Sequence, residues 1–386
     1  MEKPTTTSPG AGAVLRIDFD ALVANYRTLT QAAMPARVAA VVKADGYGVG
    51  AKAVVELLAG EGCRQFFVAM LGEARAICPV LPADAEVFVL NGLQPGAEEA
   101  FLASGAIPVL NSLDQIERWS ILATSLGRKL RAALQVDSGM SRMGLSSEET
   151  AILTRNPGML EAIDPCLLMT HLACADEPGH PENARQYARF LEATAPWPGI
   201  PRALDNSGGI FLPREHFDVV RAGIALYGGA PHSGPNPMAP VISLEARIAQ
   251  VRTVPPGTGV GYGMSFLTQR ETRIATIPVG YADGLPRSLG NRGSAYVAGN
   301  RVPMVGRVSM DSITLDVTGV AEQHCMPGSP VELIGPHQSL DELARDAGTI
   351  SYEILTQLGH RYEREFLPLE RGRASCGIVD WRSAAE

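Results

Sequence analysis

Lysine is scarce in this sequence, and the usual marks of nucleic-acid-binding, secreted and membrane proteins are missing. Only four of its 33 lysines and arginines are lysine, and the 386 residues carry a formal net charge of −8. The pI near 5.5 argues against a nucleic-acid partner, because such proteins usually present a basic patch. No apolar run approaches the roughly 18 residues of a membrane helix, and residues 1–20 lack the apolar core of a secretory signal. The sequence therefore predicts a cytoplasmic protein without a membrane partner.

Cysteine is also sparse, and its spacing excludes two classes of site. The six cysteines are spread over 386 residues and no two of them form a C-x-x-C pair. This pattern is neither a disulfide framework nor a zinc site of recognised ligand spacing. His171, Asp176 and His180 lie close together in the sequence, but a strand-end histidine and a Pro-Gly loop define no ligand geometry. We expect free thiols in a reducing compartment and no bound metal.

The order of the apolar runs predicts an α/β fold. Hydrophobic residues make up 46% of the chain and charged residues 19%, as in ordinary globular proteins. Eight short runs alternate with helical stretches such as Ala51–Leu58, Leu113–Leu126 and Glu182–Ala195. The runs are Val38–Val42, Phe66–Met70, Val87–Leu90, Ile107–Leu110, Leu130–Val136, Cys166–Thr170, Arg202–Leu204 and Asp218–Val220. Eight such units predict an N-terminal (β/α)8 barrel of the TIM type.

A change of composition after Tyr227 marks a second domain. Residues 228–240 are rich in Gly and Pro and are typical of a linker. Beyond them the expected strands are Val241–Val254, Thr272–Val279, Ser294–Val297, Met304–Val317 and Val331–Ile334, and the expected helices are Leu340–Ala347 and Tyr352–Leu358. We therefore predict a barrel over residues 12–232, a C-terminal mainly β domain over residues 233–386, and a tail over residues 1–11.

Polar side chains follow nearly every apolar run, at the end where a barrel carries its active site. They are Lys43, Glu73, Asn91, Asn111, Asp137, Ser138, His171, Asp205, Asn206, Ser207 and Arg221. Loops are polar in any case, so Asn91 and Asn111 are weak indicators. Lys43, His171 and Arg221 are stronger indicators, because each comes directly after an apolar strand.

The segment around Lys43 supports three interpretations. Gly46, Gly48 and Ala51 fit the G-x-G-x-x-A dinucleotide fingerprint, but the next run lacks the acidic residue that such a unit requires. A surface lysine that only extends to solvent is a second interpretation, although a strand end inside a barrel suits it poorly. In the third, Lys43 forms a Schiff base, because desolvation at the barrel mouth lowers its pKa and makes the amine nucleophilic near neutral pH.

A set of motifs makes the chain resemble alanine racemases, which attach pyridoxal 5'-phosphate to a lysine. AVVKADGYGVGA (residues 40–51) is similar to their cofactor-attachment segment. Further similar motifs follow in the family's order: VDSGMSRMG (136–144), LMTHLA (168–173), DNSGG (205–209), RAGIALYG (221–228), VGYGMSF (260–266), PVGYADG (278–284), VGRVSMD (305–311) and ISYEIL (350–355). The resemblance covers essentially the whole chain. It implies a (β/α)8 barrel followed by a β domain, as the runs do.

Pyridoxal phosphate chemistry requires an imine lysine, a phosphate cradle, a partner for the pyridine nitrogen and proton donors. By resemblance Lys43 is the lysine. Barrels commonly bind phosphate after strands seven and eight, where Ser207, Gly223 and Ile224 lie. Ser207 equally suits a helix N-cap. The resemblance adds Tyr47 and Tyr352 as hydroxyl donors, and it places Asn206 near the cofactor.

The resemblance assigns Arg221 to the pyridine nitrogen, with His171 orienting it. A guanidinium only donates hydrogen bonds, so that nitrogen stays unprotonated and the ring is a weaker electron sink, which suits racemisation. Without the resemblance, His171 is more typical of a structural histidine. Arg142 resembles the arginine near the cofactor's phenolic oxygen and the substrate carboxylate. Many family members carry a lysine seven residues before this arginine. Here Gln135 stands in its place, and we infer that its neutral amide supports Arg142 instead.

Racemisation removes a proton from one face of the α-carbon and returns one to the other, which favours two bases. Lys43 is the first base. Spacing does not choose among the nine tyrosines, and the resemblance selects Tyr262 as the second. It also implies a homodimer in which Tyr262 and Met310 reach the site from the other subunit. Met310 then binds the substrate carboxylate through its backbone, and Tyr281 and Asp311 line the entrance.

Three alternative functions stay open from the sequence. A non-catalytic pyridoxal phosphate-binding protein has such a barrel but lacks the second domain. A barrel-type amino-acid decarboxylase has both domains but places an acidic residue where Arg221 stands. A racemase of broader specificity, acting on serine, lysine or arginine, differs in side chains that the sequence does not locate. The family function is interconversion of L- and D-alanine, which supplies D-alanine for peptidoglycan.

Overall fold

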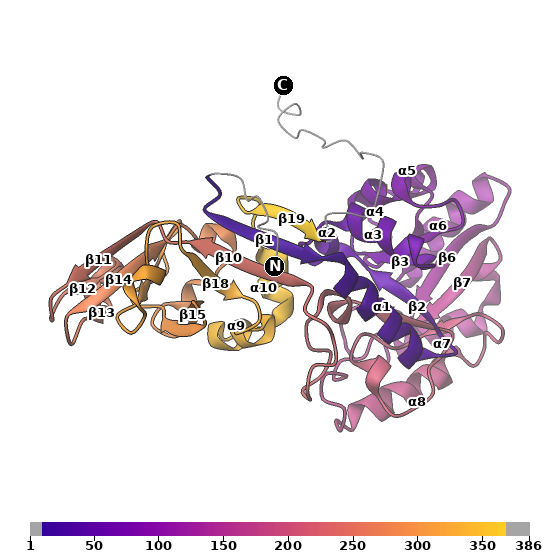
Figure 1. The fold of residues 1–386 in the computed structure, drawn as a ribbon. Coiled ribbons are helices and arrows are strands. Elements are labelled where there is room, and N and C mark those ends of the chain that lie inside the picture. Colours follow the sequence, from indigo (N-terminus) through magenta and orange to yellow (C-terminus); the bar gives the residue numbers. More distant parts are fainter. Residues whose placement is uncertain (1–9, 368–386) are drawn as a thin grey trace.

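The computed structural model describes residues 10–367 and consists of a barrel and a β domain joined by long strands (Figure 1). Residues 1–9 of the predicted tail and Cys376 lie outside the described residues. The other five cysteines are free thiols. No helix of the described part is long and apolar enough to cross a membrane.

Eight parallel strands form a nearly closed barrel in the order β8-β7-β6-β5-β4-β3-β2-β9. The strands are β2 (Arg37–Val41), β3 (Gln65–Val68), β4 (Glu86–Val89), β5 (Ile107–Leu110), β6 (Leu130–Gln135), β7 (Ile163–Met169), β8 (Arg202–Ala203) and β9 (Val219–Ala222). The Arg221 N–H donates to the Asp205 carbonyl at 2.8 Å, between β9 and the end of β8. The predicted barrel is confirmed, and each of the eight apolar runs overlaps a barrel strand.

Helices cover the outside of the barrel (Figure 1). They are α1 (Phe19–Ala33), α3 (Ala51–Gly60), α4 (Leu71–Ile77), α5 (Glu98–Ser104), α6 (Leu113–Ser125), α7 (Ser147–Arg155) and α8 (Glu182–Thr194), with the short turn α2 (Lys43–Tyr47) at the end of β2. The strands are apolar on both faces because side chains fill the barrel and helices cover it. Within the core, the rings of Phe67 and Phe88 stack with centroids 4.7 Å apart. This packing fixes the strand ends from which the functional side chains project.

The second domain is built from three antiparallel or mixed sheets. The largest has the order β16-β15-β18-β10-β1-β19, the second the order β11-β14-β17, and β12 pairs with β13. The strands are β1 (Ala13–Asp18), β10 (Ile242–Arg247), β11 (Gln250–Val254), β12 (Gly259–Val260), β13 (Phe266–Leu267), β14 (Thr272–Ile277), β15 (Ser294–Val297), β16 (Asn300–Pro303), β17 (Ile313–Asp316), β18 (Pro330–Ile334) and β19 (Glu363–Leu367). Its helices are α9 (Leu340–Ala347) and α10 (Ser351–Gln357). The predicted mainly β domain is therefore confirmed.

Strand β1 belongs to this second sheet, although it precedes the whole barrel in the sequence. It pairs antiparallel with β10 and parallel with β19. Residues 13–18, which the predicted boundary assigns to the barrel, thus contribute a strand to the β domain. The boundaries 12–232 and 233–386 themselves stay a prediction. The pairing joins the start of the chain to its last described strand and fixes the two domains to each other (Figure 1).

Two strand predictions in the β domain are wrong in extent. The expected strand Val241–Val254 is divided into β10 and β11, which belong to different sheets. Of the expected strand Met304–Val317, only β17 has regular strand pairing, while Met304 forms an isolated bridge to Leu315. Gly306 has φ of 79°, and its N–H donates to the Asn291 side chain at 2.7 Å instead of to a neighbouring strand. Residues 305–312 therefore form a loop, which carries Met310 and Asp311.

Candidate active site

The backbone becomes left-handed immediately after Lys43. Ala44, Asp45, Gly46 and Tyr47 have φ of 52°, 53°, 63° and 55°, so α2 is one turn of left-handed helix. Left-handed backbone is strained for residues with a Cβ, and such strain concentrates at functional sites. Within the turn, the Gly46 N–H donates to Val42 O at 2.9 Å. The turn brings Lys43 and Tyr47 to the same end of the barrel.

Packing of α10 against this turn brings a second tyrosine close to it. A Cβ on Gly48 would lie 2.3 Å from the Leu355 carbonyl oxygen, so only glycine allows the approach. The rings of Tyr47 and Tyr352 have centroids 6.1 Å apart, and Tyr47 also stacks on Tyr227 at 4.6 Å. Burial raises the pKa of Tyr352 to about 12, so its hydroxyl keeps its proton as a hydrogen-bond donor.

Lys43 lies half-buried among cations at the end of β2. Burial lowers the pKa of Lys43, Arg142 and Arg221 lower it further, and Glu73 opposes them. A lysine whose charged form is destabilised in this way is a better nucleophile and base near neutral pH. The structure therefore brings Lys43 and Arg221, which the sequence placed at strand ends, near Arg142, which only the resemblance assigned to the site.

Arg221 is fully buried on β9 and is held by main-chain oxygens. It donates to Ala203 O at 2.9 Å, Thr170 O at 2.6 Å and Leu204 O at 3.3 Å. Burial lowers the pKa of Arg221 to about 10, against the opposing effect of Asp205, so it stays charged at neutral pH. Among residues 10–367 no carboxylate forms an ion pair with this guanidinium, which is thus a fixed, charged donor.

His171 lies 3.3 Å from Arg221, measured between Nδ1 of the ring and Nη2 of the guanidinium. Burial lowers the pKa of His171 to about 3, and the positive charges of Arg221, Arg142 and Lys43 lower it in the same direction. The ring is therefore neutral at physiological pH, and a neutral Nδ1 accepts a hydrogen bond from Arg221. This geometry agrees with the expected orienting role of His171.

Ser207 organises the loop that follows β9. Its hydroxyl oxygen accepts from the Gly223 N–H at 2.9 Å and from the Ala225 N–H at 3.3 Å, at the start of the 3-10 helix η4 (Ile224–Tyr227). A Cβ on Gly223 would lie 2.4 Å from the Tyr47 hydroxyl, so glycine lets the tyrosine reach this loop. Asn206 beside it accepts from the Gly209 N–H at 3.0 Å. Hydroxyls and main-chain N–H groups thus converge at the ends of β8 and β9.

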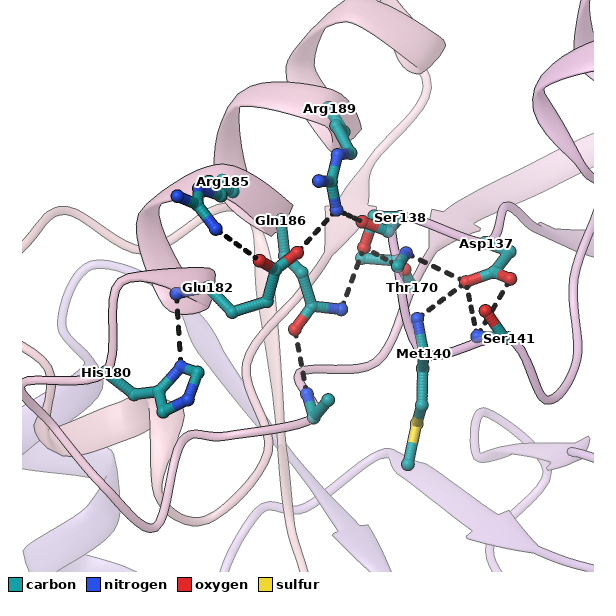
Figure 2. Close-up of polar contacts among 12 residues, drawn as sticks. Asp137, Ser138, Met140, Ser141, Thr170, His180, Glu182, Arg185, Gln186 and Arg189 are labelled. Atoms are coloured by element: carbon teal, nitrogen blue, oxygen red, sulfur yellow. Dashed lines mark hydrogen bonds and ion pairs between the residues drawn. The ribbon is translucent and has the colours of Figure 1, made fainter.

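The loop that carries Arg142 is held by its own aspartate (Figure 2). The Asp137 carboxylate accepts from the N–H groups of Gly139 at 2.9 Å, Met140 at 2.9 Å and Ser141 at 3.0 Å. Ser141 has φ of 55°, so these bonds hold a strained residue directly before Arg142. Gln135 donates to Met143 O at 3.1 Å. Its amide therefore supports the backbone next to Arg142.

Helix α8 fastens the same loop to the end of β7 (Figure 2). The buried Gln186 accepts from the Ala173 N–H at 2.8 Å and donates to Ser138 Oγ at 3.3 Å, and Ser138 is 2.8 Å from Thr170 Oγ1. Arg189 donates to Ser138 O at 3.0 Å. The sequence did not identify Gln186 or Arg189 as part of the site, because their contacts with Ser138 join residues 48 and 51 positions apart in the chain.

The remaining predicted residues lie in the β domain and are exposed. Tyr262 (72% exposed) is in the 3-10 helix η5 (Tyr262–Met264) between β12 and β13, and this hairpin lies at the far end of the molecule from α2 (Figure 1). Met310 and Tyr281 are also exposed and lie on adjacent segments. Asp311 pairs with Arg361 at 2.5 Å. One subunit therefore does not bring Tyr262 to Lys43.

Two hollows of the molecule differ in the side chains that line them. A cavity of about 610 Å3 beside the strand ends is lined by His171, Asn206 and Tyr352, among others. A larger hollow of about 960 Å3 lies on the outside of the barrel around Ile121 and Met159. No cluster of three or more potential metal ligands occurs among residues 10–367. The strand ends are thus the part of the described chain where basic, hydroxyl and main-chain donor groups converge.

Comparison with protein families decides the family of the chain. The profile of the alanine racemase N-terminal domain matches residues 17–231, and that of the alanine racemase C-terminal domain matches residues 241–366. The chain belongs to the alanine racemase family. A relative from Agrobacterium fabrum, named "Alanine racemase, catabolic", is 53% identical over 360 residues. The matched region covers 93% of this chain and 93% of the relative. An "Alanine racemase" of Brucella canis is 51% identical over 380 residues, with 95% of this chain and 96% of the relative covered.

Solved structures of alanine racemases share the fold. That of the Bartonella henselae enzyme, described as having covalently bound pyridoxal phosphate, has a TM-score of 0.90 and 44% identity, covering 93% of this chain and 100% of its own. The Streptomyces coelicolor A3(2) enzyme has a TM-score of 0.86 and 34% identity, covering 92% and 98%. Both of the predicted domains therefore occur together in known members of the family.

Pyridoxal 5'-phosphate is the cofactor of the alanine racemase family, and the residues present fit it. A phosphate requires several donors at close range, and the chain supplies the Tyr47 hydroxyl and main-chain N–H groups around Gly223, where a Cβ would fill the approach. For the aldehyde, Lys43 offers an amine whose pKa is lowered. A pyridine nitrogen requires a donor such as the buried Arg221.

Proposed function

We propose that this chain is an alanine racemase that interconverts L- and D-alanine with pyridoxal 5'-phosphate bound at Lys43. The observation that carries the proposal is that Lys43, whose pKa is lowered, and the buried, charged Arg221 lie on two adjacent strands of the barrel. An arginine at the pyridine nitrogen distinguishes this site from a decarboxylase site, in which an acidic residue is expected. Membership of the alanine racemase family supports the same activity.

The protein's own groups then have distinct tasks. When bound, the cofactor withdraws electrons from the α-carbon of the amino acid and makes its proton acidic. Arg221 donates to the pyridine nitrogen and is held in place by Thr170 O at 2.6 Å, with His171 beside it. Arg142 binds the substrate carboxylate and the phenolic oxygen. The Lys43 amine moves a proton on one face of the α-carbon.

The second face requires a second base, and we assign it to Tyr262 of another copy of the chain. Its exposure of 72% leaves the hydroxyl available to a partner, and its distance from α2 within one subunit requires one (Figure 1). Met310 would bind the substrate carboxylate from the same partner, with Tyr281 and Asp311 lining the entrance. The proposal therefore includes a homodimer with two composite sites.

Two further aspects of the role stay predictions. The cytoplasmic location follows only from the sequence. Supply of D-alanine for peptidoglycan and degradation of alanine use the same reaction, and the name of the Agrobacterium fabrum relative favours the catabolic use for that protein. A racemase of broader specificity is the second candidate, because the side chains that limit the substrate lie at the proposed dimer contact.

The direct test is racemisation of individual amino acids by the purified protein with added cofactor. We expect alanine enantiomers to equilibrate, and serine, lysine and arginine to react far more slowly. Lys43→Ala should lower kcat by roughly 10²- to 10⁴-fold, the usual contribution of a general base. Lys52→Ala is the matched control, since Lys52 is exposed at the start of α3. Full activity of Lys43→Ala would refute the proposal.

The assignment of the second base has its own test. Tyr262→Phe should slow exchange of the α-proton with solvent more for L-alanine than for D-alanine, because each base serves one face. Tyr296→Phe, a tyrosine stacked on His337 in the β domain, is the control. Equal slowing of both enantiomers would contradict the two-base assignment while leaving the racemase activity intact.

A further inference from the structure

A single carboxylate ties the residue after Lys43 to a neighbouring barrel unit. Glu73, in the first turn of α4, accepts from the Ala44 N–H at 2.6 Å with Oε1. Its Oε2 accepts from the N–H groups of Ala69 at 2.8 Å and Met70 at 2.9 Å, where β3 ends and α4 begins. Both oxygens are thus committed, one to the turn that follows Lys43 and one to the next strand of the barrel.

The contact is made where the backbone most needs support. Ala44 is the first residue of the left-handed turn, and it has a Cβ that disfavours this conformation. The next residue of the turn, Asp45, accepts from the Ala51 N–H at 2.8 Å. Glu73 is the side chain from another element that accepts from Ala44, so it fixes the turn relative to the barrel and not only to itself. A hydrogen bond to a charged acceptor is among the stronger ones in proteins.

We propose that Glu73 is a positioning residue for Lys43: by holding the left-handed turn, its carboxylate fixes where the Lys43 amine points. This inference rests on the proposed function, because it gives Lys43 the role of base. The attachment is short, since Ala44 is the next residue after Lys43. A shift of the Ala44 N–H moves the peptide that carries the lysine. Reaction rates are sensitive to ångström-scale misplacement of a reacting group.

Charge gives the same carboxylate a second effect on the lysine. The groups that face Lys43 are the cations Arg142 and Arg221, the neutral His171, and Glu73 as the negative charge. Glu73 raises the pKa of Lys43, whereas burial and the two arginines lower it. Removal of the Glu73 charge therefore lowers the pKa of Lys43 further. The acid limb of the rate profile, where Lys43 gains a proton, then moves to lower pH.

Glu149 provides a matched control elsewhere in the same barrel. It occupies the same position in the first turn of α7 and accepts from the Ser146 N–H at 2.9 Å. Its other oxygen accepts from the Leu113 N–H of α6 at 3.3 Å. Glu149 thus caps its own helix and reaches a neighbouring element as Glu73 does, but that element does not carry Lys43.

The experiment compares Glu73→Gln, Glu73→Asp and Glu149→Gln with the wild type as cofactor-loaded proteins. An amide has one acceptor oxygen and cannot serve both the Ala44 and the Ala69 N–H groups. Glu73→Gln should lower kcat by about 10- to 100-fold, change KM for alanine much less, and shift the acid limb to lower pH. Glu73→Asp keeps the charge but shortens the reach, so kcat should fall without that shift. Glu149→Gln should change neither.

Two outcomes overturn the inference. One is a Glu73→Gln protein whose kcat and pH profile match those of Glu149→Gln. The other is a Glu73→Gln protein in which KM for alanine rises by the same factor as kcat falls, because that result indicates a general structural role. Absorbance of the lysine-linked cofactor against pH tests the charge effect without turnover. A wild type that fails to racemise alanine would refute the proposed function, while this absorbance titration would still test Glu73. If Glu73→Gln does not fold, Glu73→Asp provides the test.

Discussion

Gly223 offers a direct test of the proposed phosphate cradle, because one added methyl group there would collide with the Tyr47 hydroxyl. In Gly223→Ala the new Cβ would lie 2.4 Å from the Tyr47 hydroxyl oxygen and 3.2 Å from its Cζ. The tyrosine has little room to retreat. Its ring is buried and stacked on Tyr227 at 4.6 Å, and the Tyr227 hydroxyl donates to Val41 O at 3.0 Å.

The cost follows from this rigidity. Overpacking by one methyl group in a tight core typically costs about 1–3 kcal/mol. If the clash is relieved by moving either the Tyr47 hydroxyl or the Gly223 backbone, a group assigned to the proposed phosphate cradle is displaced. Since about 1.4 kcal/mol corresponds to a factor of ten, the Kd for pyridoxal phosphate should rise roughly 5- to 150-fold. Ser207, which accepts from the Gly223 N–H at 2.9 Å, resists a backbone shift.

The assay is an absorbance titration of cofactor into cofactor-free protein, combined with thermal unfolding. Gly60→Ala is the control, since Gly60 is the last residue of α3 and a Cβ there meets nothing within 4 Å. Alanine is a better helix former, so the control should bind normally and be no less stable. Wild-type affinity in Gly223→Ala would refute the placement of the phosphate between Tyr47 and Gly223.

Two further predictions concern the residues that support the site. Because the pKa of His171 is about 3 in the folded protein, the unfolded chain gains its proton first as pH falls below about 6.5. Between about pH 6.5 and pH 3 this group should lower the free energy of unfolding by up to about 1.4 kcal/mol for each unit by which the pH falls. In urea titrations, His171→Gln should show a shallower dependence of the unfolding free energy on pH. Asp137→Ala leaves the N–H groups of its loop without their acceptor and should cost about 1–3 kcal/mol of stability and raise KM for alanine. Asp84→Ala, which removes an exposed ion pair with Arg64, should cost less than about 1 kcal/mol; equal losses in the two variants would contradict the loop assignment.

The barrel was accessible from the sequence because its strands are buried on both faces. Such strands are continuous apolar runs, and β5 begins and ends at the predicted residues. Strand β1 was not identified, because its partners β10 and β19 lie more than two hundred residues away in the sequence. Strand β17 was overextended, because the turn at Gly306 depends on a hydrogen bond that its N–H donates to the Asn291 side chain.

The site divides in the same way between local and long-range causes. The positions of Lys43, His171 and Arg221 followed from the rule that barrel active sites lie at strand ends, and the structure places them together. The left-handed turn after Lys43 was not predictable, because Ala44 has no local preference for it and Glu73 holds it from another barrel unit.

The sequence by itself determined the barrel, the identity of the rare lysine at a strand end, and the family. These features depend on the period of apolar residues and on motifs, which are local in the chain. The tertiary structure alone decided how the lysine is held and charged. Its pKa depends on burial and on Arg142, Arg221 and Glu73, which come from different strand ends. Electrostatic effects act over ångströms of space, and only folding brings those groups within that range.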